Sequence, residues 1–222
     1  MKKDYEAVIL NYINEKEMRS AIEKLHEFTT KDLEKRGELY NIFTKYSHIF
    51  MRYEPELTIE LLLKNFKTNI DPNKIISAIM STEREKREKV VDYLEDLIKN
   101  NKVKDKNIHN LFIFFISQIN TESSNQKLLN YLHTLGQKEQ SNQYQRHKEP
   151  VVFFDIDYAF NVFSQFKIYP AQSYTLSIMG KHAEAIKVAL FNGCEKLAKE
   201  IASNVEDQKI KKMLWLEVRI KK

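Results

Sequence analysis

The chain has 222 residues, of which 42% are hydrophobic and 30% are charged, and it contains only four glycines, four prolines and one cysteine. So few turn-forming residues argue against a turn-rich β fold, and a single cysteine excludes a disulfide framework or a cysteine-based zinc site within the chain. The formal net charge is +5, but acidic and basic residues alternate, as over 82–89, which is typical of solvated helix faces and not of a nucleic-acid-binding stripe.

Apolar residues in the N-terminal part recur at the spacing of amphipathic helices. Residues 5, 8, 9, 12 and 13 share one helix face, Asp4 is placed to cap it, and a second stripe over 18–28 follows a polar corner at 14–17. Because the connection is so short, these two helices are expected to pack antiparallel. The same pattern predicts helices over 39–50, from Pro55, from Asp71-Pro72, over 90–98, over 108–119 after Asp105, and over 128–135 with Gly136 as the C-cap.

A polar segment at 137–150 interrupts the pattern. We expect a mobile loop there, and not a domain boundary, because the helical pattern resumes afterwards. Residues 151–154 are too isolated to build a sheet and are expected to lead into a helix in extended form. The remaining helices are predicted over 156–163, over 170–179 with Gly180 at the end, over 185–190 ending near Gly193, and over 194–205.

These elements predict an all-α fold, an α-solenoid of stacked antiparallel helix pairs similar to clathrin heavy-chain repeats. Residues 1–136 would form its N-terminal part, 137–150 the mobile polar loop, and 151–222 the C-terminal part of the same solenoid, which is expected to continue in a longer protein. Segments 16–25 and 180–189 resemble each other, but the repetition is loose, and we interpret it as a degenerate solenoid without a fixed period.

No residue pattern points to catalysis or to metal binding. The six histidines lack ligand spacing, so His109 is expected to be structural, and Cys194 lies on an apolar stripe where a core residue is expected. Asp155 and Asp157 stand where a helix begins and are expected to cap it. No glycine-rich phosphate loop occurs. We therefore expect no catalytic, cofactor-binding or metal-binding residue, no cofactor, and no enzymatic activity.

The last helix differs from the others. Ile210, Met213, Leu214 and Val218 are interpreted as one apolar stripe, while Trp215, Leu216 and Ile220 add apolar area on other faces. A helix that is apolar nearly all round is expected to be buried nearly all round. We therefore predict an interface or chain-continuation surface formed by five residues: Met213, Leu214, Trp215, Leu216 and Ile220.

Several segments resemble one known family in the same order along the chain. The longest is 173–190, a helix pair containing Gly180-Lys181-His182-Ala183-Glu184-Ala185-Ile186, and the most specific is Lys211-Lys212-Met213-Leu214-Trp215-Leu216. Shorter matches lie at 93–95, 108–111, 128–132, 157–159 and 197–202. The chain is similar on these residues to the family of vacuolar protein sorting-associated protein 18, the deep orange family.

This resemblance implies a role. The family forms class C core subunits of the HOPS and CORVET tethering complexes, and its full-length form has a β-propeller, a long α-solenoid and a C-terminal RING zinc finger. Only the solenoid is matched here, so neither zinc nor ubiquitin-ligase activity is carried over. The implied partners are other class C sorting subunits and, indirectly, SNAREs and Rab GTPases. The implied location is cytoplasmic, peripheral on late endosome, vacuole or lysosome membranes, with no nucleic acid bound.

Two further hypotheses come from other classes of protein. A clathrin-type coat or cargo-adaptor solenoid shares the alanine-isoleucine rhythm, and it would lack a C-terminal RING in the full-length protein. A helical enzyme or lipid-binding domain would need a ligand-sized internal pocket with converging polar groups, whereas a continuous apolar core would contradict it.

Overall fold

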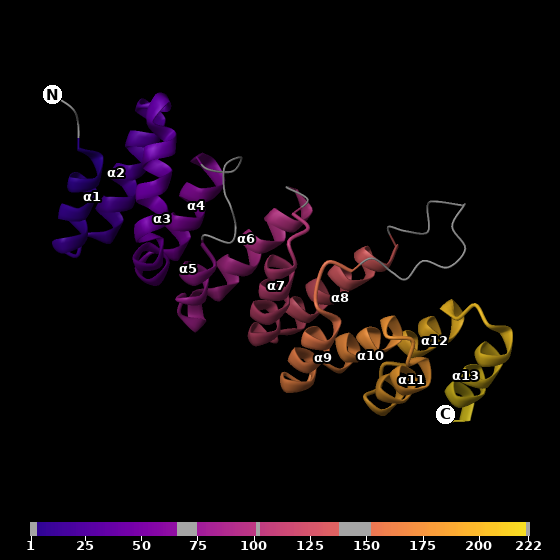
Figure 1. The fold of residues 1–222 in the computed structure, drawn as a ribbon. Helices are drawn as coiled ribbons and strands as arrows, with labels where there is room; N and C mark the ends of the chain where they lie inside the picture. Colours follow the sequence, from indigo (N-terminus) through magenta and orange to yellow (C-terminus); the bar gives the residue numbers. More distant parts are fainter. Residues whose placement is uncertain (1–3, 66–74, 101–102, 138–151, 221–222) are drawn as a thin grey trace. The chain divides into compact units, whose positions relative to one another are not determined.

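The computed structural model describes residues 4–65, 75–100, 103–137 and 152–220, and within 135–137 and at residue 220 it describes the main chain only (Figure 1). All regular elements in these ranges are helices, which confirms the all-α prediction. The chain divides into two compact units, residues 1–103 and residues 104–222, and each is described by itself. The expected mobile loop at 137–150 lies almost wholly outside the described residues, so the division of the solenoid at that loop stays a prediction.

The described residues of the first unit form six α-helices, most of them at the predicted places. Asp4 caps the first helix through its carboxylate, which accepts a 3.0 Å hydrogen bond from the Ala7 N–H, and Pro55 opens the fourth at a first-turn position where no N–H is needed. The predicted helix start at Asp71-Pro72 lies outside the described residues. The helices are α1 (Tyr5–Asn14), α2 (Met18–Lys31), α3 (Arg36–Tyr53), α4 (Pro55–Asn65), α5 (Ile76–Met80) and α6 (Arg87–Lys99).

The core of the first unit forms around α3. This helix packs against α2, α4 and α5, and its Leu39, Phe43 and Phe50 are completely buried. The aromatic ring of Tyr5 on α1 meets that of Phe28 on α2 edge to face, with centroids 5.0 Å apart. The two N-terminal helices therefore pack together as the short corner between them predicts.

In the described part of the second unit there are seven helices, and each packs on its successor or on the next but one (Figure 1). They are α7 (Lys106–Ile119), α8 (Glu122–Gln137), α9 (Ile156–Gln165), α10 (Tyr169–Ile178), α11 (His182–Phe191), α12 (Glu195–Asn204) and α13 (Gln208–Ile220). Helix α8 continues to Gln137, so Gly136 lies inside its last turn, and the predicted C-cap at Gly136 is wrong. Residues 152–154 form no strand, in agreement with the prediction of a lead-in to a helix.

The last five helices follow a fixed period, contrary to the expectation of loose repetition. They begin at residues 156, 169, 182, 195 and 208, so the starts are spaced evenly, at every thirteenth position of the chain. The period also holds in the core, where four equivalent residues are buried despite their different sizes: Phe163, Leu176, Ala189 and Ala202. This part of the chain is therefore a regular array of single helices, each one packed against the next.

Three of the corners between these helices share one backbone conformation. Lys167, Gly180 and Gly193, which follow the same spacing as the helix starts, have φ angles of 57°, 75° and 75°, in the left-handed region. In each corner the following N–H bonds back to a carbonyl oxygen five residues earlier, as in Lys181 N–H to Leu176 O at 2.9 Å. This is the Schellman motif, and it ends one helix and starts the next within a few residues.

Candidate interaction surface

Helix α13 carries the surface residues that the sequence predicts, and its start is fixed by a capping carboxylate. One oxygen of Asp207 accepts hydrogen bonds from the N–H groups of Lys209 at 2.8 Å and Ile210 at 3.1 Å. The helix packs against α11 and α12 of the second unit. The ammonium group of Lys211 also donates a hydrogen bond to the carbonyl oxygen of Ser203 on α12.

One side of α13 completes the core of the second unit. Leu214 and Val218 are buried in a cluster with residues of α10, α11 and α12, and Trp215 is half-buried against the same cluster. Four alanines at 185, 189, 198 and 202 belong to this cluster. Because they have small side chains, the helices can approach closely, and α13 contacts both α11 and α12.

The opposite side of α13 is apolar and exposed. Met213 is 67% exposed and Leu216 57%, while Ile210, which lies one turn before Leu214, is 45% exposed. Of the predicted stripe of Ile210, Met213, Leu214 and Val218, only Leu214 and Val218 are buried, so the expectation that the four share one buried face is wrong. The side chain of Ile220 lies outside the described residues. The described residues thus cover the helix on one side only, and the predicted interface at Met213, Leu214, Trp215, Leu216 and Ile220 stays a prediction.

Three basic side chains share this exposed side: Lys209, Lys212 and Arg219. Lys209, Met213 and Leu216 follow each other at i, i+4 and i+7. Lys212, Leu216 and Arg219 have the same spacing, so the apolar and basic side chains form two rows that meet at Leu216. None of the three cations forms an ion pair with any residue that the structure describes. We call these five residues, Lys209, Lys212, Met213, Leu216 and Arg219, the α13 outer face.

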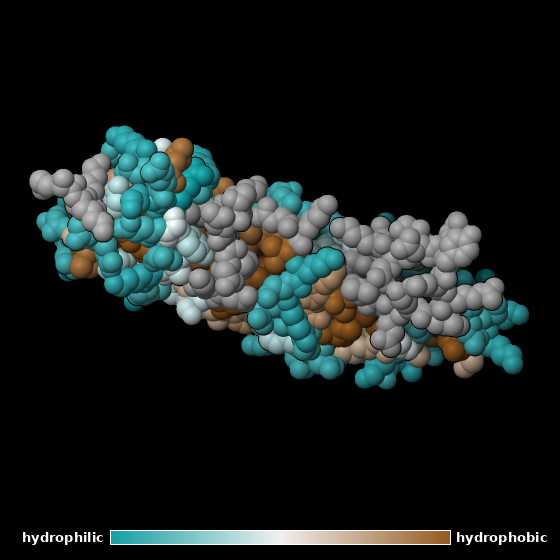
Figure 2. Space-filling model, turned by 45° about the horizontal axis from the view of Figure 1, so that its top comes forward, coloured by the Kyte–Doolittle hydropathy of each residue, from teal (hydrophilic) through white to brown (hydrophobic). Residues whose placement is uncertain are grey.

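The flank of α13 carries its one acidic residue, Glu217. This side chain is half-buried, and its Oε2 atom is shielded from solvent without a hydrogen-bond partner among the described residues. Figure 2 shows that the described surface is mainly hydrophilic on the face drawn, with smaller hydrophobic areas between the polar side chains. An exposed row whose charged residues are all basic differs from the segments of alternating charge elsewhere in this chain, such as residues 82–89.

The other candidates from the sequence have structural positions. His109 on α7 is fully buried, with Nδ1 2.6 Å from the Tyr131 hydroxyl of α8. Asp155 caps α9, where its carboxylate accepts a 3.0 Å hydrogen bond from the Tyr158 N–H, and the ammonium of Lys106 lowers the pKa of that carboxyl group. Cys194 is half-buried at the start of α12, where burial raises the pKa of its thiol. A raised pKa disfavours the nucleophilic thiolate.

Sequence reasoning missed one small pocket, which lies between α2 and α4 of the first unit. Its volume is about 190 Å³, below the range of about 300–1,000 Å³ that is usual for ligand sites. Ile22, Leu57 and Leu61 line it together with His26, and the charged residues Glu23, Glu60 and Lys64 surround them. The period-3.6 pattern assigns a face to each helix, but it does not show where two faces leave a gap.

No three histidine, cysteine, aspartate or glutamate side chains of the described ranges are grouped so that they could hold a metal ion. Among the helices that the structure describes, none is long and apolar enough to span a bilayer.

Comparison with known proteins shows the family. A family model described as the second half of the VPS18 α-solenoid domain matches residues 5–221. The chain is 29% identical over 178 residues to the vacuolar protein sorting-associated protein 18 homolog of Drosophila melanogaster, an alignment covering 77% of this chain and 16% of the relative. It is 27% identical over 223 residues to vacuolar sorting protein 18 of Arabidopsis thaliana, covering 98% of this chain and 21% of that protein.

The chain thus spans about a fifth or less of the length of these relatives. The matched model names an α-solenoid, and the helices of each unit pack on their neighbours in order, so the predicted fold class is confirmed. The resemblance stated from the residues is confirmed as well. This chain belongs to the VPS18 α-solenoid family, and it corresponds to the second half of that solenoid domain.

Proposed function

We propose that this chain is a scaffold segment of a vacuolar sorting complex, and that the complex tethers membranes before docking and fusion. The observation that carries the proposal is the family match over residues 5–221, together with relatives whose names place them in vacuolar protein sorting. The scaffold works by protein–protein contact, without catalysis and without a cofactor.

The packing of the helices supports a mechanism based on geometry. In the second unit each Schellman corner fixes the angle between successive helices, and a buried side chain at every thirteenth residue fills the space between them. An array packed in this way holds its shape, since interiors at native density resist deformation. Such a segment can hold other modules of the subunit and its neighbours at fixed positions while two membranes are brought together.

The proposed partners are the other class C sorting subunits of HOPS or CORVET, which would reach SNAREs and Rab GTPases indirectly. The proposed location is cytoplasmic, at the surface of late endosome, vacuole or lysosome membranes. Binding of nucleic acid is not part of the proposal, because the surface charges of the chain are mixed in sign. A clathrin-type coat role is less well supported, because the matched family is a vacuolar sorting family.

A reconstituted tethering assay tests this function. The purified complex, assembled with the full-length protein, is added to fluorescent vesicles that carry the lipids of the target organelle, and clustering is followed by light scattering and microscopy. The proposal predicts clusters with the whole complex and none when the full-length protein is left out. Assembly of the protein into a coat lattice on single vesicles, without clustering, would instead support the coat alternative.

A further inference from the structure

We infer that the α13 outer face is the docking surface for an acidic amphipathic helix of a partner protein. The inference rests on the proposed function, and it adds the chemistry of the partner. The face has two exposed apolar side chains, Met213 and Leu216, between three exposed cations, Lys209, Lys212 and Arg219. No described residue of the chain covers it, although the other side of α13 is packed on α11 and α12.

The spacing of the face fits a helix as its occupant. Its residues recur at i, i+4 and i+7, and rows of this kind form ridges with grooves between them, into which the side chains of another helix can pack. Helices of the second unit use the same kind of contact, since α10, α11 and α12 each have helices on more than one side. A partner helix would bury Met213 and Leu216 in the centre of the contact, where truncation of apolar side chains has its largest effect on affinity.

The charge of the face selects an acidic partner. Lys209, Lys212 and Arg219 have no ion-pair partner in the described parts of the chain, and the one carboxylate of α13, Glu217, lies on the other flank, one turn after Met213. Lys212 and Arg219 lie on one flank of the Met213–Leu216 pair and Lys209 lies in line with it, so carboxylates along that flank of a partner's apolar stripe would meet these cations. A second copy of α13 is disfavoured because it would bring six cations together.

A membrane surface fits the face less well than a helix. An interfacial helix needs a broad apolar side that enters the headgroup region, usually with Trp or Phe in it. On α13, Trp215 is turned to the packed side, and only Met213 and Leu216 stand between the cations. Two apolar side chains match the narrow stripe of one docked helix better than the area that a bilayer would bury.

A binding titration with the 222-residue chain tests the inference. The probe is a fluorescein-labelled synthetic helix of three heptads, with leucine at positions a and d and glutamate at e and g. A control peptide has lysine at e and g. We expect the chain to bind the glutamate peptide at least tenfold more tightly than the lysine peptide at low salt, by fluorescence anisotropy. The preference should shrink as the salt concentration is raised, because exposed charges are then screened.

Charge reversal on the protein tests the role of the cations more strictly. The double variant Lys212→Glu/Arg219→Glu should lose at least tenfold in affinity for the glutamate peptide and gain affinity for the lysine peptide. A matched control, Arg84→Glu/Lys89→Glu, reverses two exposed cations of the first unit and should leave both affinities unchanged. Equal binding of the two peptides by the wild type, or an unchanged peptide preference in Lys212→Glu/Arg219→Glu, would overturn the inference.

Two further arms separate the alternatives. In the first, vesicles of phosphatidylcholine and phosphatidylserine are sedimented with the chain. If the chain binds vesicles through Lys212 and Arg219 but does not bind the peptide, the partner of this face is a membrane and the inference is overturned. Co-purification of sorting subunits with the full-length wild-type protein is measured in parallel. If sorting subunits are recovered but the glutamate peptide does not bind, the inferred acidic helix is wrong and the proposed function stands. If the peptide binds but no subunit is recovered, the proposed function is wrong.

Discussion

The Ser173 hydroxyl on α10 donates a 2.7 Å hydrogen bond to the main-chain carbonyl oxygen of Ala185 on α11, and Ser173 is completely buried. The bond crosses between two consecutive helices of the regular array in the second unit. A buried hydroxyl is costly unless it is hydrogen-bonded, and in this structure the Ala185 carbonyl oxygen satisfies the Ser173 hydroxyl.

Replacement of Ser173 by alanine should therefore destabilise the second unit. The change Ser173→Ala removes one buried hydrogen bond, and we expect a loss of about 1 kcal/mol in the free energy of unfolding. Urea denaturation followed by circular dichroism measures it. The matched control is Ser203→Ala on α12, where an exposed hydroxyl bonds within its own helix, and its effect should stay below about 0.5 kcal/mol. Equal effects of the two changes would contradict the role given to the inter-helix bond.

Two buried tyrosines should respond in opposite ways to loss of their hydroxyl groups. Tyr131 bonds His109 in the interior, so Tyr131→Phe should cost about 1–3 kcal/mol because the histidine loses a buried partner. The Tyr93 hydroxyl is buried without a hydrogen bond to any described residue, so Tyr93→Phe should be neutral or stabilising. Urea denaturation of the two variants at neutral pH makes the comparison, and a larger loss for Tyr93→Phe would refute it.

Ionisation of the same two tyrosines should lower the free energy of unfolding at alkaline pH. Burial raises the pKa of both hydroxyls above the ordinary value of 10. A raised folded-state pKa contributes stability below pH 10, and this contribution is lost as the pH rises towards the folded-state pKa, since only the unfolded chain ionises there. Unfolding free energies measured between pH 8 and pH 11 should fall above pH 10, and the slope should be smaller in Tyr93→Phe.

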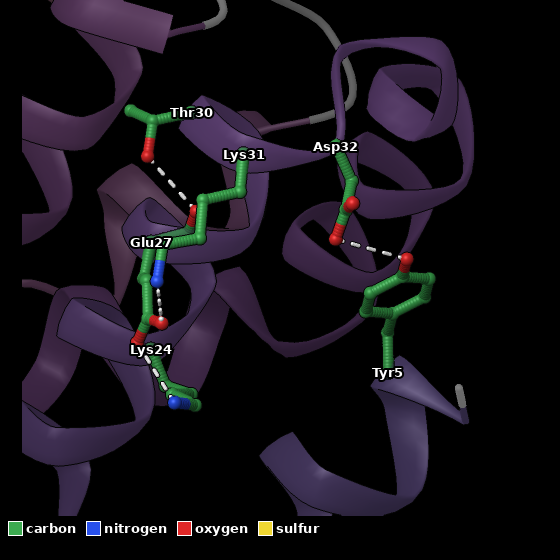
Figure 3. A network of polar contacts seen from close by, with 6 residues as sticks. All are labelled: Tyr5, Lys24, Glu27, Thr30, Lys31 and Asp32. Carbon is green, nitrogen blue, oxygen red and sulfur yellow. Dashed lines mark hydrogen bonds and ion pairs between the residues drawn. The ribbon is translucent and has the colours of Figure 1, made fainter.

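Glu27 should govern part of the acid response of the first unit. Its carboxylate lies between the ammonium groups of Lys24 at 2.8 Å and Lys31 at 2.7 Å, and these bonds lower its pKa from 4.5 to about 2 (Figure 3). A lowered pKa contributes stability above pH 4.5 that is lost as the pH falls towards 2. Because all three side chains are substantially exposed, the effect is small.

The test compares the wild type with Glu27→Gln. The wild type should have the higher free energy of unfolding at pH 7. The difference in this free energy between the two proteins should disappear as the pH falls from 5 to 2. The bond from the Tyr5 hydroxyl to Asp32, drawn beside this network, does not involve Glu27, so the substitution removes only the two ion pairs with lysine (Figure 3). A difference that is constant over this pH range would show that the ion pairs are not its cause.

Substitutions at the corners of the array should reveal the backbone strain of the left-handed conformation. Gly193 has a φ of 75°, and open space surrounds the position of an added Cβ, so Gly193→Ala tests conformation alone. A residue with a side chain costs about 1 kcal/mol or more in the left-handed region, and we expect a loss of about that size. Lys167, at the equivalent corner, already bears this strain, so Lys167→Gly should not destabilise. Thermal unfolding of both variants measures the contrast.

Helical spacing predicted most helices of the fold, but the period was hidden by its residue types. At the equivalent core positions Phe163 gives way to Leu176 and then to alanine at 189 and 202, so apolar character repeats but residue identity does not. At the equivalent corners Lys167 stands where the next two corners have glycine. Residue types recur at this spacing only in the later part of the array, as in Gly180 and Gly193 or Ala189 and Ala202, whereas apolar character recurs at all four core positions.

The surface of α13 was predicted only in part, for a physical reason. The sequence shows that this helix has more apolar residues than one packed face requires. It does not show which apolar residues face α11 and α12, because that choice depends on how the three helices pack. The packed pair, Leu214 and Val218, and the exposed pair, Met213 and Leu216, are equally apolar in sequence and differ only in the assembled unit.

The most direct test of the scaffold role is affinity purification of the full-length protein from its own cells, with quantitative identification of the proteins that come with it. We predict recovery of other class C vacuolar sorting subunits. We also predict reduced recovery of at least one of them with Met213→Ser/Leu216→Ser, but not with the exposed control Leu33→Ser. Purification of an intact, correctly folded protein without any vacuolar sorting subunit would contradict the account.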